Sequence, residues 1–206
     1  MNPTLVTAPS VEPVTLAEAK EHLKIDHADE DTYITNLITA ARRFCEKYTR
    51  LALIEQTWKW TFDHWPGIMD VCDETLPLTL RGGDVRFVEV PVTPLISVTS
   101  ITTYDDQDTA TVWAASNYYT SSPQGRIYRR TGASWPSSGR AGDGIEFVFK
   151  AGFGTAASDV PTPLRQGLLQ LIAHLYENRV AAGDTSSFSV PFSVTENFNL
   201  YKRISL

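Results

Sequence analysis

Three groups of residues in this 206-residue chain have types and spacings that could support chemistry. The first is Gly152-Phe-Gly-Thr-Ala-Ala157, which follows an apolar run and fits the G-x-G-x-x-A pattern of dinucleotide-binding turns. That chemistry requires a helix to begin inside the motif, because its free N–H groups bind the pyrophosphate. Here residues 158–163 separate the glycines from the next helical pattern. We therefore expect a glycine-bearing exit from a strand.

The second group is the acidic run Asp26-His-Ala-Asp-Glu-Asp31, whose carboxylates are the ligand type that calcium prefers. The run lacks the glycine and the distal glutamate of an EF-hand loop. Carboxylates also stabilise the first turn of a helix through its dipole. The sequence favours this structural interpretation over a calcium site.

The third group consists of the imidazoles and thiols, which show no common ligand spacing. The four histidines and two cysteines are His22, His27, His64, His174, Cys45 and Cys72. There is no zinc spacing, P-loop, HExxH or GxSxG motif. Cys45 is expected to be a buried, inert thiol. We therefore predict no catalytic, cofactor-binding or metal-binding residue.

Composition narrows the class of protein further. A net charge of −6 argues against a general nucleic-acid binder, whose surface would be basic. No apolar run approaches the length of a membrane span, and the first residues lack a basic and hydrophobic leader. We expect a protein that is intracellular at synthesis and does not span a membrane.

Two helices are predicted before residue 55. The first begins at the capping box Thr15-Leu-Ala-Glu18 and ends near Ile25. The second covers about Glu30 to Arg50, with an apolar face made by Ile34, Leu37, Ile38, Ala41, Phe44, Tyr48 and Leu51. Its last turns carry Arg42, Arg43, Lys47 and Arg50. These cations suit a solvated, dipole-stabilised helix end, and contact with a phosphate or an acidic neighbour remains open.

From Gln56 the apolar period changes from helical to alternating, as in Trp58, Trp60 and Phe62. Strands are predicted at 56–62, 76–80, 85–90, 96–104, 111–113, 118–120, 126–129 and 145–149, separated by polar turns. This spacing predicts an antiparallel sandwich or small barrel, inserted between the helices. The tryptophans Trp58, Trp60, Trp65, Trp113 and Trp135 pack in its core or, alternatively, line a ligand pocket.

A third helix is predicted from Pro161 to Arg179, and its apolar face is broad enough to contact partners on more than one side. The residues proposed for a bundle or ring core are Leu164, Leu168, Leu171, Ile172, Leu175 and Tyr176. A flexible connector, Ala181–Ser187, and an apolar tail follow. The tail residues proposed for docking are Phe188, Val190, Phe192, Phe198, Leu200, Tyr201 and Ile204. We expect residues 188–206 to be dispensable for folding.

These patterns predict an α+β protein: an α-helical bundle with an inserted antiparallel β-sandwich or barrel-like domain and an extended C-terminal tail. The predicted divisions are 1–55 for an N-terminal arm and two helices, 56–152 for the β domain, 153–180 for the central helix and 181–206 for linker and tail.

Several stretches occur in an order that matches one known family. They are Thr15–Asp26 with Asp29–Asp31 and Ile34–Ile38, Val90–Ile101 leading to Tyr104–Asp106, Phe149–Gly154 with Val160-Pro161, Leu171–Arg179, Val190–Phe192 and Tyr201–Arg203. Together they resemble the phage head–tail connector (adaptor) family, which also serves gene transfer agents.

The resemblance implies a structural protein that forms a ring, a dodecamer in the particle, beneath the portal. Such a ring extends the DNA channel, through which DNA passes without sequence-specific binding, and joins the portal to stopper, neck or tail proteins. It implies a place in the neck of a virion or phage-like particle after synthesis in the bacterial cytoplasm, with residues 188–206 on the portal. The alternatives are a stopper or tail terminator, or a ligand-binding β module.

Overall fold

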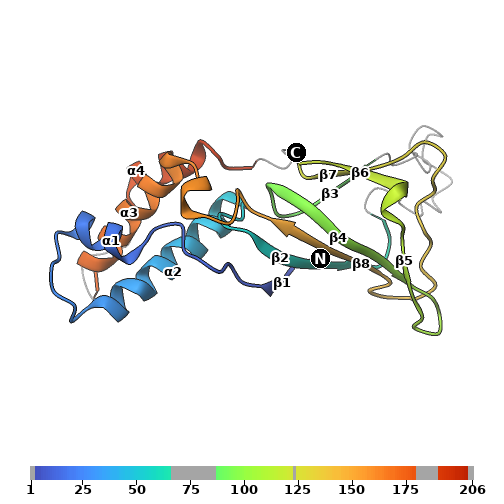
Figure 1. Ribbon diagram of the computed structural model, residues 1–206, viewed down its shortest axis with the longest axis horizontal. Helices are drawn as coiled ribbons and strands as arrows, with labels where there is room; N and C mark the ends of the chain where they lie inside the picture. The colour runs from blue at the N-terminus through green and yellow to red at the C-terminus, as the bar shows by residue number, and fades with distance from the viewer. Residues whose placement is uncertain (1–2, 66–86, 123, 180–189, 204–206) are drawn as a thin grey trace, which may run out of the picture. The chain divides into compact units, whose positions relative to one another are not determined.

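The computed structural model describes residues 3–65, 87–122, 124–179 and 190–203 of an α+β chain (Figure 1). Two compact units divide it. The β unit contains Met1–Ala8 and Gln56–Ala151, and the helical unit contains Pro9–Glu55 and Gly152–Leu206. The strand predicted at 76–80, the turn at 81–84, the connector 181–187, Cys72, Phe188 and Ile204 lie outside the described residues.

The helical unit has four described helices: α1 (Leu16–Leu23), α2 (Asp31–Thr49), α3 (Thr162–Glu177) and α4 (Phe192–Asn199). The capping box that the sequence predicts for α1 is present, because the Glu18 N–H donates to Thr15 Oγ1 at 3.2 Å and the Thr15 N–H donates to Glu18 Oε2 at 2.8 Å. Lys24 (φ 57°) and Arg50 (φ 62°) end α1 and α2 in the left-handed conformation.

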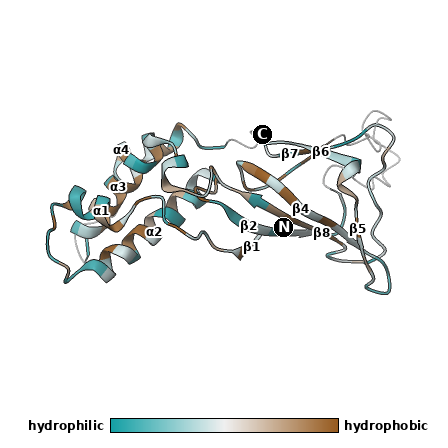
Figure 2. Ribbon diagram, viewed as in Figure 1, coloured by the Kyte–Doolittle hydropathy of each residue, from teal (hydrophilic) through white to brown (hydrophobic). Residues whose placement is uncertain are grey.

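The core of the helical unit forms where α2 and α3 face each other (Figure 2). Its fully or nearly buried side chains include Ile34, Ile38, Ala41, Cys45, Leu164, Leu168, Leu171 and Ile172. Leu37 and Tyr48 pack against this core from its edge, whereas Phe44 is exposed, which corrects its predicted place on the buried face. Cys45 is buried as expected, and burial raises the pKa of its thiol to about 12.

The C-terminal segment is not the extended tail that the sequence suggested. Pro191 precedes helix α4, whose Val194 and Phe198 are spaced by one helical turn and are both fully buried in the core of the helical unit. A Cβ atom at Gly167 of α3 would lie 2.6 Å from Phe198 Cε1, so the glycine makes room for the ring. The prediction that residues 188–206 are dispensable for folding is therefore wrong.

The larger sheet of the β unit has five antiparallel strands in the order β1-β2-β8-β4-β5. Their bounds are β1 (Thr4–Thr7), β2 (Gln56–Phe62), β8 (Ile145–Ala151), β4 (Leu95–Tyr104) and β5 (Ala110–Val112). Strand β1 was expected only as part of an extended arm, and its pairing with β2 places residues 1–8 in the β unit. The sequence of Thr4–Thr7 does not show the alternation of apolar and polar residues that indicates a strand, because all four residues are exposed and none faces a core.

A second antiparallel sheet has the order β3-β7-β6, with β3 (Phe87–Glu89), β7 (Arg126–Arg129) and β6 (Tyr118–Ser121). The described strands agree with the predicted runs to within two residues at each end. Beyond β8, Gly152 has φ 146°, and a Cβ atom there would lie 2.6 Å from the backbone of Ile54. The glycine run is thus the exit of a strand, as predicted.

Aromatic rings fill the core of the β unit. Trp65 contacts Trp135 and Trp113, with ring centroids 4.3 Å and 6.2 Å away, and donates its indole N–H to the Pro136 carbonyl at 2.7 Å. Trp60, Phe62 and Phe147 extend the cluster. Rings that contact one another in this way fill the space that a ligand pocket between them would need.

Replacing Phe198 by alanine should lower the free energy of unfolding of the helical unit by about 3–5 kcal/mol, because the change empties a buried aromatic site. Gly167→Ala should also destabilise this unit, because its methyl group would overlap the Phe198 ring. The control Phe192→Ala, on the exposed side of α4, should change the stability by less than about 0.5 kcal/mol. Denaturant unfolding, followed by the circular dichroism of the helices, measures the stability of all three variants. Equal losses of stability in Phe198→Ala and Phe192→Ala would contradict this packing.

Candidate interaction surfaces

The described part of the chain contains no group of three or more histidine, cysteine, aspartate or glutamate side chains placed to hold a metal ion. None of its helices is long and apolar enough to cross a membrane. Candidate functional features are therefore ion-pair networks, a groove and exposed apolar side chains.

Arg42 is the centre of a buried ion-pair network on α2. Its Nε donates to Glu12 Oε2 at 2.7 Å and its Nη1 donates to Glu46 Oε2 at 2.9 Å, while its side chain is only 6% exposed. The other oxygen of Glu46 accepts the Leu53 N–H at 3.1 Å. The network therefore ties the segment before α1 and the segment after α2 to the middle of α2. The sequence left open whether the basic residues at the end of α2 contact an acidic neighbour. Arg42 does so within its own chain, through Glu12 and Glu46.

A second network joins the end of α3 to the start of α2. Arg179 donates to Glu30 Oε1 at 2.6 Å, and the Tyr176 hydroxyl donates to the other oxygen of Glu30. The guanidinium also lies over the rings of Tyr176 and Tyr33, at 4.2 Å and 4.7 Å from their centroids. The hydrogen bond from Arg179, followed by that from Tyr176, lowers the pKa of Glu30 to about 2. No sequence signal pointed to this network, because its members meet only in the folded helical unit.

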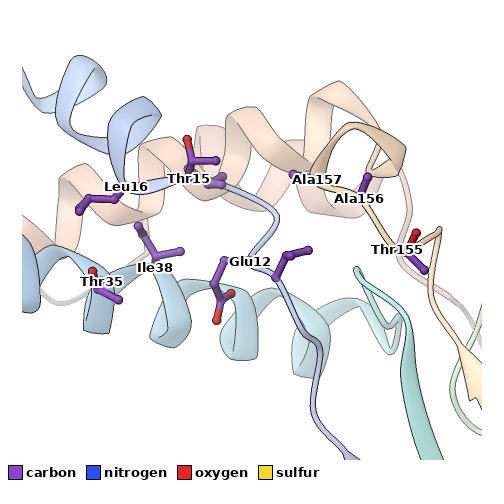
Figure 3. Close-up of a pocket in the computed structure, with 10 residues that line it drawn as sticks. Glu12, Thr15, Leu16, Thr35, Ile38, Thr155, Ala156 and Ala157 are labelled. Atoms are coloured by element: carbon purple, nitrogen blue, oxygen red, sulfur yellow. The ribbon is translucent and has the colours of Figure 1, made fainter.

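A groove of about 410 Å³ lies on the helical unit between the segment before α1, α2 and the turn before α3 (Figure 3). Its lining is Val11, Glu12, Val14, Thr15, Leu16, Thr35, Ile38, Thr155, Ala156 and Ala157. The Glu12 carboxylate is occupied by Arg42 and by the Thr39 hydroxyl, at 3.0 Å from the latter. The polar groups that remain are hydroxyls and backbone groups, and they supply no base with a nucleophile.

Several large apolar side chains of the helical unit remain uncovered at its C-terminal end. Phe192 is 78% exposed and Leu200 is 71% exposed, at opposite ends of α4. Phe44 is also exposed and stacks on Tyr48, with ring centroids 6.1 Å apart. Lys202 lies over the same Tyr48 ring, 4.5 Å from its centroid. Apolar side chains that stay exposed in this way are candidates for contact with another protein.

The proposed docking residues thus divide into two groups. Phe198 faces the core of its own unit and is not available, which corrects its assignment to a docking surface. Phe192 and Leu200 are exposed, and Val190 and Tyr201 are partly buried. In α3, the buried residues are Leu164, Leu168, Leu171 and Ile172, with Leu175 and Tyr176 packed at the edge of the same core. A role of these α3 residues in a ring stays a prediction.

Residues 13–110 match the sequence model of the family described as phage gp6-like head-tail connector protein. This part of the chain, 98 of its 206 residues, is similar to the family. Among curated proteins, none has a sequence that matches the chain.

Solved structures resemble the chain along its whole length. One chain, from the neck of an empty gene transfer agent particle computed with C6 symmetry, is 24% identical, with a TM-score of 0.77. Another, from the virion of a native gene transfer agent particle, is 24% identical, with a TM-score of 0.79. Each match covers 100% of this chain and 97% of the other chain. At this identity the likeness establishes a shared fold.

Replacing Arg42 by leucine should lower the free energy of unfolding by about 3–5 kcal/mol, because Glu12 and Glu46 would lose their buried counter-ion. The neighbouring Arg43 is exposed, so Arg43→Leu should change the free energy of unfolding by less than about 0.5 kcal/mol. Urea unfolding of both variants against the parent makes this comparison. A similar small effect of the two substitutions would show that the network is not structural.

The Glu30 network should stabilise the helical unit in a pH-dependent way. Because folding lowers the Glu30 pKa from 4.5 to about 2, its contribution is complete above about pH 4.5 and is lost as the pH falls toward 2. The difference in melting temperature between the parent and Glu30→Gln should therefore be largest near neutral pH and shrink between pH 4.5 and 2. The exposed Glu21→Gln serves as the control. A difference independent of pH would rule out the Arg179 and Tyr176 contacts as its source.

Proposed function

We propose that this chain is a structural adaptor that assembles as a ring, of twelve copies in the particle, in the neck of a tailed phage or a gene transfer agent. The ring sits beneath the portal, extends the DNA channel and joins the head to stopper, neck or tail proteins. Its work is to bind other proteins, and it carries out no catalysis.

The observation that carries this proposal is the coincidence of family and fold. The family match covers residues 13–110, and the structural match extends over the whole chain. The similar chains come from the neck of gene transfer agent particles, computed with C6 symmetry in one case and C12 symmetry in another, the latter with a TM-score of 0.70. Rotational symmetry of this order favours a ring of copies at the same level of the particle.

The exposed residues of α4 support a docking role for the C-terminal segment. The helix is held to the unit by Val194 and Phe198, so Phe192 and Leu200 are presented outward on an ordered support. An apolar side chain that is fixed in place loses little conformational entropy on binding. The portal is the partner that we assign to these two residues.

The charge of the connector also fits a channel through which DNA moves. The chain has 24 acidic and 18 basic residues, and this net charge of −6 opposes the retention of DNA that counterion release at basic sites would cause. A stopper or tail terminator, the runner-up, would occupy a lower level of the same neck. The order in which proteins join purified heads distinguishes these possibilities.

The double variant Phe192→Ser/Leu200→Ser should keep the stability of the parent but join portal-bearing heads at least about tenfold less well, because it removes two exposed apolar anchors. The control Val6→Ser removes an exposed apolar side chain from the β unit and should leave incorporation unchanged. Particles are purified and their content of connector is measured by quantitative mass spectrometry, with electron microscopy of the neck. If the parent chain is never recovered with particles, the proposed function is wrong.

A further inference from the structure

The three-stranded sheet of the β unit carries a row of aromatic rings on one face. Phe87, Tyr128 and Tyr119 lie directly opposite one another on strands β3, β7 and β6. The ring centroids of Phe87 and Tyr128 are 5.4 Å apart, and those of Tyr128 and Tyr119 are 5.1 Å apart with nearly parallel planes. We call this row the aromatic face.

The aromatic face points away from the core of its unit. Residues that alternate with it, Val88 and Ile127, are 1% and 0% exposed, and Tyr118 stacks on the buried Trp113. Side chains that alternate along a strand point to opposite sides of the sheet. On the other side, Tyr119 is 49% exposed, and Phe87 and Tyr128 are partly exposed. A stacked aromatic row on the solvent side of a small sheet contributes nothing to the core beneath it.

Arginines extend the aromatic face at both ends. The Arg126 guanidinium lies over the Phe87 ring at 4.5 Å, and that of Arg130 lies over the Tyr119 ring at 5.6 Å. Arg126 Nε has no hydrogen-bond partner in the described structure, with Glu89 Oε2 3.8 Å away. Arg130 is exposed and forms no ion pair with any described residue. Tyrosine, phenylalanine and arginine are the residue types that protein interfaces favour.

The β4–β5 hairpin of the same unit carries the complementary chemistry. Its turn holds three aspartates, of which Asp105 accepts the N–H groups of Gln107 and Thr109 at 2.9 Å and 2.8 Å, and Asp108 pairs with Arg140 at 2.9 Å. Asp106 is exposed and has no ion pair with a described residue. On the adjoining edge strand β5, Val112 is 64% exposed. The hairpin thus offers a carboxylate and an apolar side chain together.

We propose that the aromatic face of one copy binds the β4–β5 hairpin of a second copy, with Arg130 paired to Asp106 and Val112 placed against the aromatic row. The two surfaces are different patches of one unit, and in Figure 1 the hairpin extends away from the three-stranded sheet. A contact between two different patches is heterologous, so it repeats from copy to copy and closes into a ring or continues as a filament. This inference rests on the proposed ring and specifies which two surfaces meet between neighbouring copies.

Charge favours a second copy over DNA as the occupant. The arginines lie on a chain whose net charge is −6, so another copy brings an excess of carboxylates to the contact. The guanidinium groups of Arg126 and Arg130 both lie over aromatic rings, and a guanidinium held there can still pair with a carboxylate through its N–H groups.

Disulfide trapping on the full chain tests the contact. In a parent carrying Cys72→Ser, the buried Cys45 is the remaining native thiol. Tyr119→Cys and Gln107→Cys, the latter beside Asp106 in the exposed turn, are introduced singly and together, and the purified proteins are oxidised at high concentration. Mixing the two single variants should give one mixed covalent dimer, and the double variant should give a ladder of multimers. The exposed pair Tyr119→Cys and Glu21→Cys serves as the control and should give no ladder.

A charge exchange adds a second readout. Arg130→Asp and Asp106→Arg should each lower the yield of trapped dimer by about tenfold, because each places like charges together, and their combination should restore it. Equal trapping in the control pair, only symmetric Tyr119–Tyr119 dimers, or no ladder would overturn the contact. So would cross-linking of position 119 to a different protein in particles, or retention of DNA that depends on Arg126 and Arg130. A ladder from a chain that never joins particles would support this contact and refute the proposed function.

Discussion

The close approach of α4 to α3 at Gly167 is the contact on which the helical unit depends. A side chain at this position would overlap the Phe198 ring, so the absence of a Cβ atom lets the two helices meet. Glycine inside a helix costs about 1 kcal/mol relative to alanine. Burial of a phenylalanine contributes more than that, about 1.5–3 kcal/mol for a side chain of this size. The free-energy cost of Gly167 within α3 is therefore smaller than the stabilisation gained when the Phe198 ring of α4 is buried beside it.

This packing changes what the C-terminal segment can do. Because Val194 and Phe198 are part of the core, the segment behaves as a structural element of the subunit. The same helix turns Phe192 and Leu200 outward, where a partner can reach them. The proposed docking surface is thus built on a folded support, and its strength depends on the stability of the helical unit. A partner that binds this proposed surface would meet a conformation that already exists.

The β unit is connected to the helical unit through neighbouring strands. Besides residues 1–8, the β unit consists of the insertion Gln56–Ala151, and Gln56 on β2 pairs with Ala151 on β8, so the two ends of the insertion are adjacent. An insertion whose ends lie together interrupts its host at one place, which is why such insertions are tolerated. Each unit has its own core, aliphatic in the helices and aromatic in the sheets. The surfaces proposed for the portal and for a second copy accordingly lie on separate units.

The sequence alone determined the elements whose signals are local. The capping box at Thr15 was readable because its hydrogen bonds join residues three positions apart. The apolar periods of α2 and α3 and the alternation from Trp58 to Phe62 were readable because each reflects one buried face. Collinear motifs likewise indicated the connector family, which the match of residues 13–110 supports independently. The interpretation of the glycine run as the exit of a strand followed from the missing helix start.

Only the tertiary structure decided where each exposed or charged side chain meets a partner. Strand β1 has no buried face of its own and forms because β2 offers an edge. Helix α4 is short, and isolated helices of that length are unstable in water, so its conformation comes from the site beside Gly167. Arg42 reaches Glu12 across 30 positions in the sequence, a separation at which side-chain spacing carries no signal. Such contacts depend on how the elements pack, which no local pattern encodes.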